Sequence, residues 1–210
     1  MSKFYDTYWS DSSKNIIDKE LHKKDFNYKW PVIKRLIPKE SGITILDFGC
    51  GNGVFIKHMR EINPRAKFIG IDVSRIAIEK AKRTVPDAKF YVVEDGNIFP
   101  IRNSQVDFIL ASDVIEHVYN TETTFRELAR VLKHHGKILM TTPYHGLIKN
   151  ILISIIDFDL IFNPEGPHVR FYTKKSLLRS LKKVKLKAVD FGYYGRFFPI
   201  PNAMYVLAEK

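Results

Sequence analysis

The stretch Ile45-Leu-Asp-Phe-Gly-Cys-Gly-Asn-Gly-Val-Phe55 decides the fold of this 210-residue chain. An apolar strand runs into glycines at every second position, Gly49, Gly51 and Gly53, and an amphipathic run follows from Val54. In α/β proteins a strand, a glycine turn and a helix in this order bring backbone N–H groups close to a nucleotide-like ligand. The spacing differs from the dinucleotide fingerprint G-x-G-x-x-G, and no Lys-Ser or Lys-Thr follows as in a phosphate loop.

Strands and helices alternate along the central part of the chain. Short apolar runs predict strands at residues 43–48, 67–71, 89–93, 106–111 and 137–142. Amphipathic runs predict helices at residues 54–62, 74–84 and 121–133. Ser74 is expected to cap the start of the second helix, and Gly136 to cap the end of the third. Apolar strands that alternate with helices indicate a parallel sheet covered on both faces.

The two ends of the chain depart from this alternation. Residues 1–41 lack strand signals and are expected to form an N-terminal helical cap. Residues 144–172 form an apolar insertion, and residues 173–210 contain a helix followed by two strand-like runs, 186–194 and 203–209. Because no helix lies between those two runs, they suit an antiparallel hairpin.

Polar residues follow the later predicted strands, at the edge where ligands of open α/β sheets bind. The carboxylate of Asp72 can accept hydrogen bonds from both ribose hydroxyls of an adenosine, although it would also suit NAD. Asp95 can accept from an adenine amino group, Ile98 can pack on the ring, and Ser112 ends the fourth strand. Each residue alone fits an ordinary turn, so the prediction of a nucleoside site depends on their conjunction.

The pattern D-x-G-x-G-x-G headed by Asp47 resembles motif I of the class I S-adenosylmethionine-dependent methyltransferases. This resemblance implies an α/β fold: a Rossmann-like three-layer sandwich, with a mostly parallel seven-stranded sheet and a C-terminal antiparallel hairpin. It implies one domain over residues 1–210, with residues 43–143 as the cofactor-binding half, and S-adenosylmethionine as cofactor. Asp47 is expected to hold the glycine loop through backbone N–H groups and also to reach the methionine amino group, with a purely structural role as the alternative. The expected cofactor-binding residues are Asp47, Gly49, Cys50, Gly51, Asp72, Val73, Asp95, Gly96, Asn97 and Ser112.

Three further features resemble the ubiquinone-biosynthesis O-methyltransferases. They are the Glu116-His117 pair after the fourth strand, the apolar insertion after the fifth, and the Pro-Glu-Gly-Pro-His-Val-Arg-Phe-Tyr-Thr segment at 164–173. The resemblance implies methyl transfer to an oxygen of a small molecule, and a lipid-like or prenylated molecule is one possible acceptor. It also suggests a divalent metal site at Asp113, Glu116 and His117. Asp113 departs from the family, which has Glu there, and Glu-His also occurs in metal-free relatives.

Histidines are the candidate catalytic residues. An oxygen acceptor needs its proton removed, and imidazole is the commonest base for that task. His145, just after the fifth strand, and His117 are the two candidate bases, and His168 is a third; for each, a structural role is the alternative. Aromatic residues that can cover the cofactor as a lid, or pack in the core instead, are Tyr5, Tyr8 and Trp9.

The charge balance favours an anionic partner. Lys and Arg exceed Asp and Glu by 34 − 23 = 11, which suits nucleic acid, anionic lipid, a phosphorylated substrate or only a solvated surface. A nucleic-acid (tRNA) methyltransferase is therefore one alternative function, but no (Asn/Asp/Ser)-Pro-Pro-(Tyr/Phe) motif follows the fourth strand, so nucleic acid is disfavoured. A non-catalytic binding protein is another alternative, which the intact glycine loop and Asp72 disfavour.

The insertion between residues 146 and 162 is too short and too charged to span a bilayer. It is expected to cover the active site, or else to dip into an anionic membrane or clasp an apolar substrate tail. The start of the chain shows no apolar signal region, and a single cysteine, Cys50, fits a reducing compartment. We therefore expect a cytoplasmic protein, free or peripheral to the membrane, whose oligomeric state the sequence leaves open.

Overall fold

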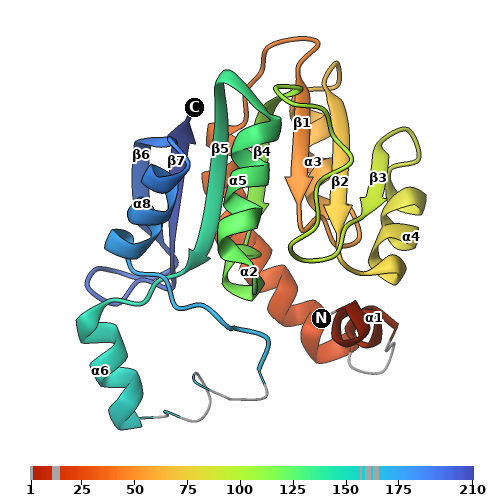
Figure 1. Ribbon diagram of the computed structural model, residues 1–210. Coiled ribbons are helices and arrows are strands. Elements are labelled where there is room, and N and C mark those ends of the chain that lie inside the picture. The colour runs from red at the N-terminus through yellow and green to blue at the C-terminus, as the bar shows by residue number, and fades with distance from the viewer. Residues whose placement is uncertain (1, 11–14, 157, 159–161, 163–165) are drawn as a thin grey trace.

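A computed structural model gives the protein's structure over residues 2–10, 15–156, 158, 162 and 166–210. The molecule is built on a seven-stranded sheet with the strand order β3-β2-β1-β4-β5-β7-β6 (Figure 1). Strands β1 to β5 are parallel, and β7 runs antiparallel to both β5 and β6. The predicted Rossmann-like fold with a C-terminal antiparallel hairpin is confirmed. The strands are β1 (Thr44–Phe48), β2 (Lys67–Asp72), β3 (Lys89–Val92), β4 (Val106–Ser112), β5 (Leu132–Pro143), β6 (Lys187–Tyr194) and β7 (Ala203–Glu209).

Helices cover both faces of this sheet, with α5 in front of it and α3 behind it in Figure 1. Since side chains alternate along a strand, β4 feeds two separate cores. Ile109 joins the core beneath α5 and α8, whereas Phe108 and Leu110 join the core beneath α2, α3 and α4. The helices are α1 (Ser2–Ser10), α2 (Asn15–Leu36), α3 (Val54–Ile62), α4 (Arg75–Thr84), the short 3₁₀ helix η1 (Ile115–His117), α5 (Thr121–Val131), α6 (Leu147–Ile156) and α8 (Lys174–Lys183).

Side-chain caps fix where two of these helices begin. Ser74 caps α4 as the sequence predicts, and its Oγ accepts a hydrogen bond from Ala77 N at 3.1 Å. Thr173 and Ser176 form a reciprocal capping box at the start of α8. Each cap satisfies N–H groups that have no partner inside the helix, so local chemistry at these two positions sets the helix boundaries.

The prediction that Gly136 caps the end of the third helix was wrong. Helix α5 ends at Val131, and its C-cap is Leu132. Strand β5 begins there because Leu132 pairs with Val106 before the register shifts to the next pair. A Cβ on Gly136 would lie 2.9 Å from the Leu132 side chain, so glycine is needed at 136 for a close approach and not to end a helix.

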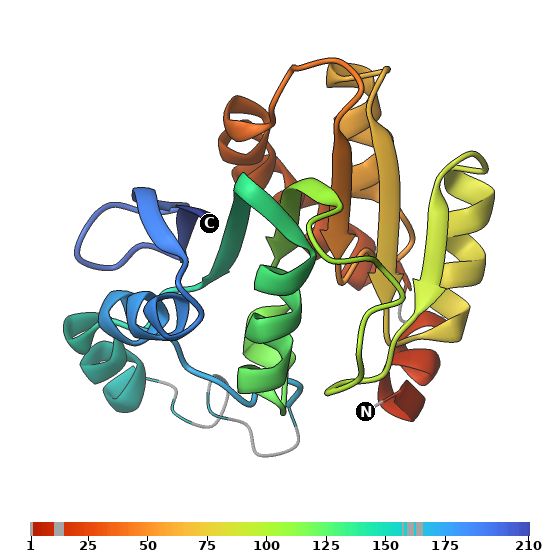
Figure 2. The same ribbon diagram turned by 45° about the horizontal axis from the view of Figure 1, so that its top comes forward.

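The carboxyl ends of the parallel strands meet at one edge of the sheet, drawn at the bottom in Figure 1. Below this edge lie α1, the start of α2, α6 and residues 166–172, which we call the return segment (Figure 1). Figure 2 shows α1 beside the start of α4 on one side and α6 near α8 on the other. Ligands of open α/β sheets bind at this edge, so these segments are placed to enclose a site.

The insertion predicted at residues 144–172 is described in part. It contains α6, none of whose side chains is buried, and it ends in the return segment. Its remaining sequence features at Asp157, Leu160, Ile161, Pro164 and Glu165 lie outside the described residues. Among the helices that the structure describes, none is long and apolar enough to cross a membrane.

Candidate active site

The glycine loop after β1 is held by β2. Gly49 N and Cys50 N both donate hydrogen bonds to Ile71 O, at 2.8 and 3.0 Å. Gly51 N donates to Asp72 Oδ2 at 2.9 Å. Three successive N–H groups are thereby bound to the neighbouring strand, which fixes the loop before any ligand enters.

Two glycines of this loop lie so close to other side chains that neither position has room for a side chain of its own. Gly49 and Gly51 have φ angles of 74° and 51°, a region that glycine adopts at little cost. A Cβ on Gly49 would lie 2.5 Å from Cγ2 of Val114, and one on Gly51 would lie 2.8 Å from the ring of Trp9. The thiol of Cys50 belongs to the core instead, and burial raises its pKa well above the usual value. The loop is therefore a backbone cradle with no side chain of its own in it.

Asp72 ties this cradle to the start of α4. Its second oxygen, Oδ1, accepts a hydrogen bond from Ser74 N at 2.9 Å. Burial raises the pKa of Asp72, and the backbone hydrogen bonds from Ser74, Gly51 and Val73 oppose that shift. Each carboxylate oxygen still has lone-pair capacity, so Asp72 can hold the loop and accept ribose hydroxyls at the same time.

Asp47 lies beneath the cradle and is the buried group without a partner there. Its side chain is 1% exposed, and Oδ2 makes no hydrogen bond with any residue that the structure describes. Burial, with a smaller contribution from the nearby Asp72 carboxylate, raises the pKa of Asp47 to about 8. The expectation that Asp47 holds the loop through N–H groups was wrong, because β2 and Asp72 do so.

The predicted adenine side of the site lies after β3. Asp95 Oδ2 accepts hydrogen bonds from Tyr119 N and Asn120 N, at 2.9 and 3.0 Å. Gly96 has a φ of 83°, and the Asn120 side chain packs where its Cβ would be. Asn97 is exposed, and its N–H closes the turn. Asp95 thus joins the β3 loop to the start of α5 and keeps Oδ1 for a ligand.

The end of β4 is anchored to β5 and to α2. Ser112 Oγ lies 3.1 Å from Thr141 Oγ1. Thr141 also donates to Asp113 Oδ1 at 2.8 Å, while Lys29 from α2 forms an ion pair with Asp113 Oδ2. Asp113 holds a left-handed φ of 48°, which is costly outside glycine and which these contacts maintain. Both oxygens of Asp113 are thus engaged.

Glu116 in η1 is buried beside this ion pair. It is 1% exposed, and neither carboxylate oxygen makes a hydrogen bond within the described residues. Burial first, and the Asp113 carboxylate second, raise its pKa well above the usual range. The Thr142 hydroxyl is near enough to oppose this shift, although the two groups do not reach hydrogen-bonding geometry. The Glu116 carbonyl accepts from Val169 N and Arg170 N, so η1 is bound to the return segment.

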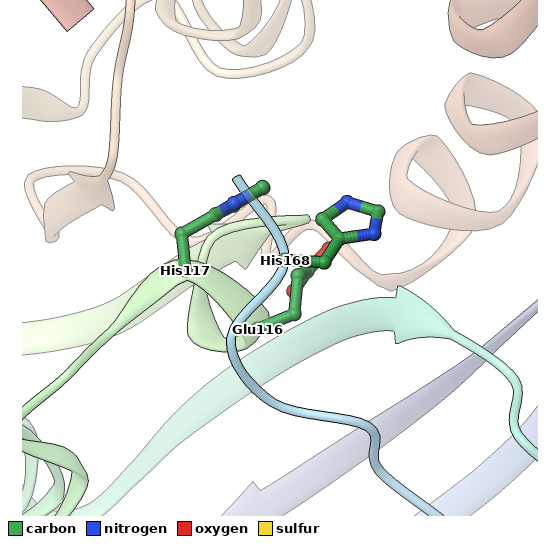
Figure 3. Close-up of side chains that lie close together, drawn as sticks. All are labelled: Glu116, His117 and His168. Carbon is green, nitrogen blue, oxygen red and sulfur yellow. The ribbon is translucent and has the colours of Figure 1, made fainter. Parts of the chain in front are cut away.

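The return segment also brings the histidines together. His117 Nδ1 lies 2.9 Å from Pro167 O, and its ring centroid lies 4.8 Å from that of His168 (Figure 3). His145 donates its backbone N–H to Tyr172 O at 3.2 Å. The segment therefore connects the ends of β4 and β5, where the candidate bases stand.

Comparison with known proteins now decides the family. Residues 21–190 match the family described as a methyltransferase domain, which is most of the chain. The chain belongs to this methyltransferase family. Membership confirms the predictions of a class I methyltransferase domain and of S-adenosylmethionine as its cofactor.

Individual relatives of this methyltransferase are distant. It is 32% identical over 100 residues to the malonyl-[acyl-carrier protein] O-methyltransferase of Legionella pneumophila, covering 47% of this chain and 35% of the relative. It is 26% identical over 163 residues to the ubiquinone biosynthesis O-methyltransferase of Cereibacter sphaeroides, covering 71% and 62%. A methyltransferase solved in complex with the Haloferax volcanii Trm112 methyltransferase activator superposes with a TM-score of 0.76 over 94% of each chain. That pair shares 16% identity, so it shows the fold alone. The chain spans less than two thirds of the length of either curated relative.

The residues of the methyltransferase cradle fit the cofactor. Asp47 Oδ2 is a buried carboxylate oxygen without a hydrogen bond to any described residue, and the methionine ammonium would supply a positively charged partner for it. At Gly49 and Gly51 the backbone is covered by the side chains of Val114 and Trp9, and a bound cofactor would lie against these side chains. Asp72 would hold the ribose. These assignments stay predictions that binding experiments can test.

The metal set suggested by the ubiquinone-enzyme resemblance does not assemble. Asp113 is engaged by Lys29 and Thr141. Glu116 and His117 instead approach His168 (Figure 3). No signal in the sequence relates residue 168 to residues 116 and 117, because the contact depends on the path of the return segment.

Sequence reasoning left open whether the N-terminal aromatics form a lid or pack in the core. Helix α1 lies on α4, where Asp6 accepts from Ser74 Oγ at 2.6 Å and Lys80 donates to Trp9 O. The Trp9 ring lies over Gly51, and the Tyr5 ring lies 6.0 Å from that of His117. Helix α1 is therefore placed as a cover across the cradle, with aromatic rings on the cofactor side and on the histidine side.

Proposed function

We propose that this methyltransferase transfers a methyl group from S-adenosylmethionine to an oxygen of a small, lipid-like acceptor. The observation that carries the proposal is His145, a buried histidine two residues after the end of β5. Two of the relatives described above are named as O-methyltransferases, which supports oxygen as the acceptor atom.

The residues of the carboxyl edge divide the work of the reaction. When bound, S-adenosylmethionine supplies an electrophilic methyl group on its sulfonium. The glycine cradle, Asp47 and Asp72 would bind and orient the cofactor, since methyl transfer depends mainly on positioning. Helix α1 and the return segment would exclude water from the edge.

His145 is suited to take the proton of the acceptor hydroxyl. Its Nδ1 lies 3.3 Å from Asn150 Oδ1, and an Nδ1–H that donates there leaves the lone pair on Nε2. Burial is the main cause that lowers the pKa of His145 to about 4, so the ring is neutral at physiological pH. A neutral ring can accept a proton at Nε2, but the lowered pKa makes His145 a weaker base than an ordinary imidazole, so it suits an acidic acceptor hydroxyl such as that of a phenol.

The surface of α6 supports an apolar acceptor that arrives from a membrane. Leu147, Ile155 and Ile156 are 77–78% exposed, an unusual state for large aliphatic side chains grouped on one short helix. The loop between β6 and β7 adds Phe197 and Phe198, which are 73% and 67% exposed. Lys149 of α6 donates to Asn202 O in that loop at 3.0 Å, so the two apolar segments are joined.

Basic residues lie on the elements next to this apolar surface, which we call the α6 surface (α6 with residues 197 and 198). Arg196 lies close enough to Lys149 to lower its pKa, after burial, which is the larger cause of a shift to about 8. Helix α8 lies near α6 in Figures 1 and 2, and it carries the exposed side chains Lys174, Lys175, Arg179, Lys182 and Lys183. An apolar surface bordered by lysines and arginines is complementary to an anionic bilayer. We therefore expect the acceptor to be reached at an anionic lipid surface.

A methyl-transfer assay on acceptors of different chemistry tests the proposal. S-adenosylhomocysteine release would be followed with a prenylated phenol, a long-chain amine and tRNA. We expect turnover on the phenol, and His145→Gln should lower kcat by about 10²–10⁴-fold, because general base catalysis contributes that much, while cofactor binding is unchanged.

The matched control is His134→Gln, since His134 is exposed and lies before the part of β5 that faces the site. It should leave kcat as it is. Turnover on the amine or tRNA but on no oxygen acceptor would overturn the proposal, and so would a His145→Gln enzyme that keeps the parent rate and a normal melting temperature.

A further inference from the structure

Three side chains with metal-ligand atoms converge next to the end of β4: Glu116, His117 and His168 (Figure 3). One ligand atom from each lies within 4.8 Å of the other two. In the described part of the chain, no second group of three such residues comes as close. Two of the ligands come from η1 and the third from the return segment, so the group spans two separate pieces of chain.

The strongest sign that this group takes a ligand is the state of Glu116. Its carboxylate is fully enclosed and makes no hydrogen bond with the described residues. A buried carboxylate without a partner is costly, and proteins satisfy it with a proton, a donor or a cation. We propose that Glu116, His117 and His168 form a binding site for a divalent transition-metal ion such as Zn²⁺.

The orientation of His117 supports this assignment. Its Nδ1 lies 2.9 Å from the carbonyl oxygen of Pro167, and a carbonyl can only accept, so Nδ1 carries the proton. That leaves the Nε2 lone pair for a metal. Imidazoles that bind metals commonly donate their other N–H to a backbone carbonyl, which fixes both tautomer and ring direction.

The ligand chemistry selects the kind of ion. Two imidazoles with one carboxylate suit Zn²⁺ or Co²⁺, whereas Mg²⁺ prefers oxygen ligands and bound water. Metal–ligand bonds are about 2.0–2.2 Å long, so the three ligand atoms would have to move closer to one another than they are in this structure. His168 is exposed on the return segment, so its ring has room to close that gap.

The neighbouring charges are compatible with a cation. The Lys29 ammonium is a competing positive charge, because it pairs with Asp113 and also lowers the pKa of Glu116. The Asp113 carboxylate also faces Glu116. An ion at this place would bind the return segment to η1 and keep a fourth position open. If the proposed function holds, the acceptor oxygen would occupy that position and the ion would polarise it. Only this consequence rests on the proposed function.

Titration of tag-free protein with Co²⁺ tests the site, because the visible absorption of bound Co²⁺ reports its ligands. We expect about one equivalent to bind tightly, with Zn²⁺ displacing it. His168→Ala should weaken binding by more than about 100-fold, since even the loss of an outer-shell partner costs 10–100-fold. The exposed position of His168 makes this variant safe for folding.

A double variant of the other adjacent histidines is the matched control. The rings of His134 and His135 lie 4.3 Å apart, and His135 contacts Glu209, so this pair is where adventitious metal would bind. His134→Ala with His135→Asn should keep the tight site; asparagine tolerates the φ of 61° at position 135.

Two results would overturn the metal site: His168→Ala binding Co²⁺ as tightly as the parent, or the control losing the tight equivalent. S-adenosylhomocysteine binding to chelator-treated protein is measured in parallel. It reports the proposed function separately, because the cradle residues lie outside the metal group. Retained cofactor binding without tight Co²⁺ binding would refute the metal site alone.

Discussion

The two halves of the carboxyl edge are built in opposite ways. In the cofactor half, at the ends of β1 to β3, Asp72 and Asp95 each accept two hydrogen bonds from backbone N–H groups of neighbouring loops. In the acceptor half, at the ends of β4 and β5, Glu116 has no hydrogen-bond partner among the described residues. The first half is held by backbone N–H donors, whereas in the second Glu116 lacks a partner among the described residues although Asp113 beside it is engaged by Lys29 and Thr141.

Asp47 is the exception within the cofactor half. Its buried Oδ2, like both carboxylate oxygens of Glu116, has no hydrogen-bond partner in the part of the chain that the structure describes, but it lies under a loop that the backbone already holds. The two halves therefore differ in how far backbone hydrogen bonds hold them in place. The cofactor half should lose its ligand when a substitution changes its shape. The acceptor half should tolerate such changes and respond instead to substitutions that change its charges or ligand atoms.

The largest expected effect on cofactor binding comes from Gly51→Ala. The new Cβ would lie 2.8 Å from the Trp9 ring, so this ring would have to move from its place over the cradle. We expect S-adenosylhomocysteine to bind about 100-fold more weakly, a loss of about 2.7 kcal/mol, as measured by calorimetry. The left-handed φ of 51° adds a stability cost of about 1–2 kcal/mol.

Gly42→Ala separates strain from shape. Gly42 has a left-handed φ of 77°, and a Cβ there would have nothing within 4 Å. Like Gly51→Ala, this variant should melt at a lower temperature than the parent protein, but it should bind the cofactor normally. Normal binding by Gly51→Ala would mean that the cradle is not the cofactor site.

A smaller, pH-dependent effect is expected from Asp47. Its pKa is about 8 in the folded protein against an ordinary 3.8, so the folded protein keeps a proton there that the unfolded chain has released. Stability from this group is complete below 3.8 and falls as the pH rises towards 8. A ligand ammonium next to Asp47 would favour the carboxylate, so binding in this window should release a proton. Cofactor affinity should then rise with pH, by at most about tenfold per unit.

Calorimetry in two buffers of different ionisation enthalpy would count the protons released. Asp72 and Cys50 are the other titratable groups beside Asp47, so Asp47→Asn is needed to assign the effect. This variant should release no proton, and neither should the parent with 5′-methylthioadenosine, which lacks the amino group. Proton release that persists in Asp47→Asn would place the titrating group elsewhere.

The cofactor half could be predicted from the sequence because its signals are local. Gly49, Gly51 and Asp72 follow strands whose apolar pattern is clear, and parallel strands bring their ends to one edge. What failed there was the division of roles: the loop is held by Asp72, although Asp47 is nearer in sequence. Backbone geometry decides which carboxylate faces the N–H groups, and a residue pattern does not contain it.

The acceptor half could be predicted only as a collection of candidates. His117 and His145 were identified by their places after strands. The pairing of Asp113 with Lys29 and the approach of His168 to Glu116 could not be foreseen. Both contacts join segments far apart in the chain, and they depend on how α2 and the return segment cross the edge of the sheet.

The smallest effect on the cofactor site is expected from the α6 surface, and it sharpens the comparison most. Ile151→Ser, Ile155→Ser and Phe158→Ser together should leave cofactor binding unchanged. These side chains are at least half exposed, so each change should alter the free energy of unfolding by no more than about 0.5 kcal/mol. Leu177→Ala in the core should cost about 2–5 kcal/mol instead.

The same triple variant should sediment less with vesicles that contain phosphatidylglycerol, because both the apolar contact and its basic border are needed for partitioning. Val189→Ser, at a half-exposed position on β6, is the matched control and should sediment like the parent. If the triple variant sediments equally, α6 does not contact lipid. If it unfolds more easily by several kcal/mol, α6 packs against the domain in solution. Either result would leave the α6 surface with a structural role only and would remove the argument for a lipid-like acceptor.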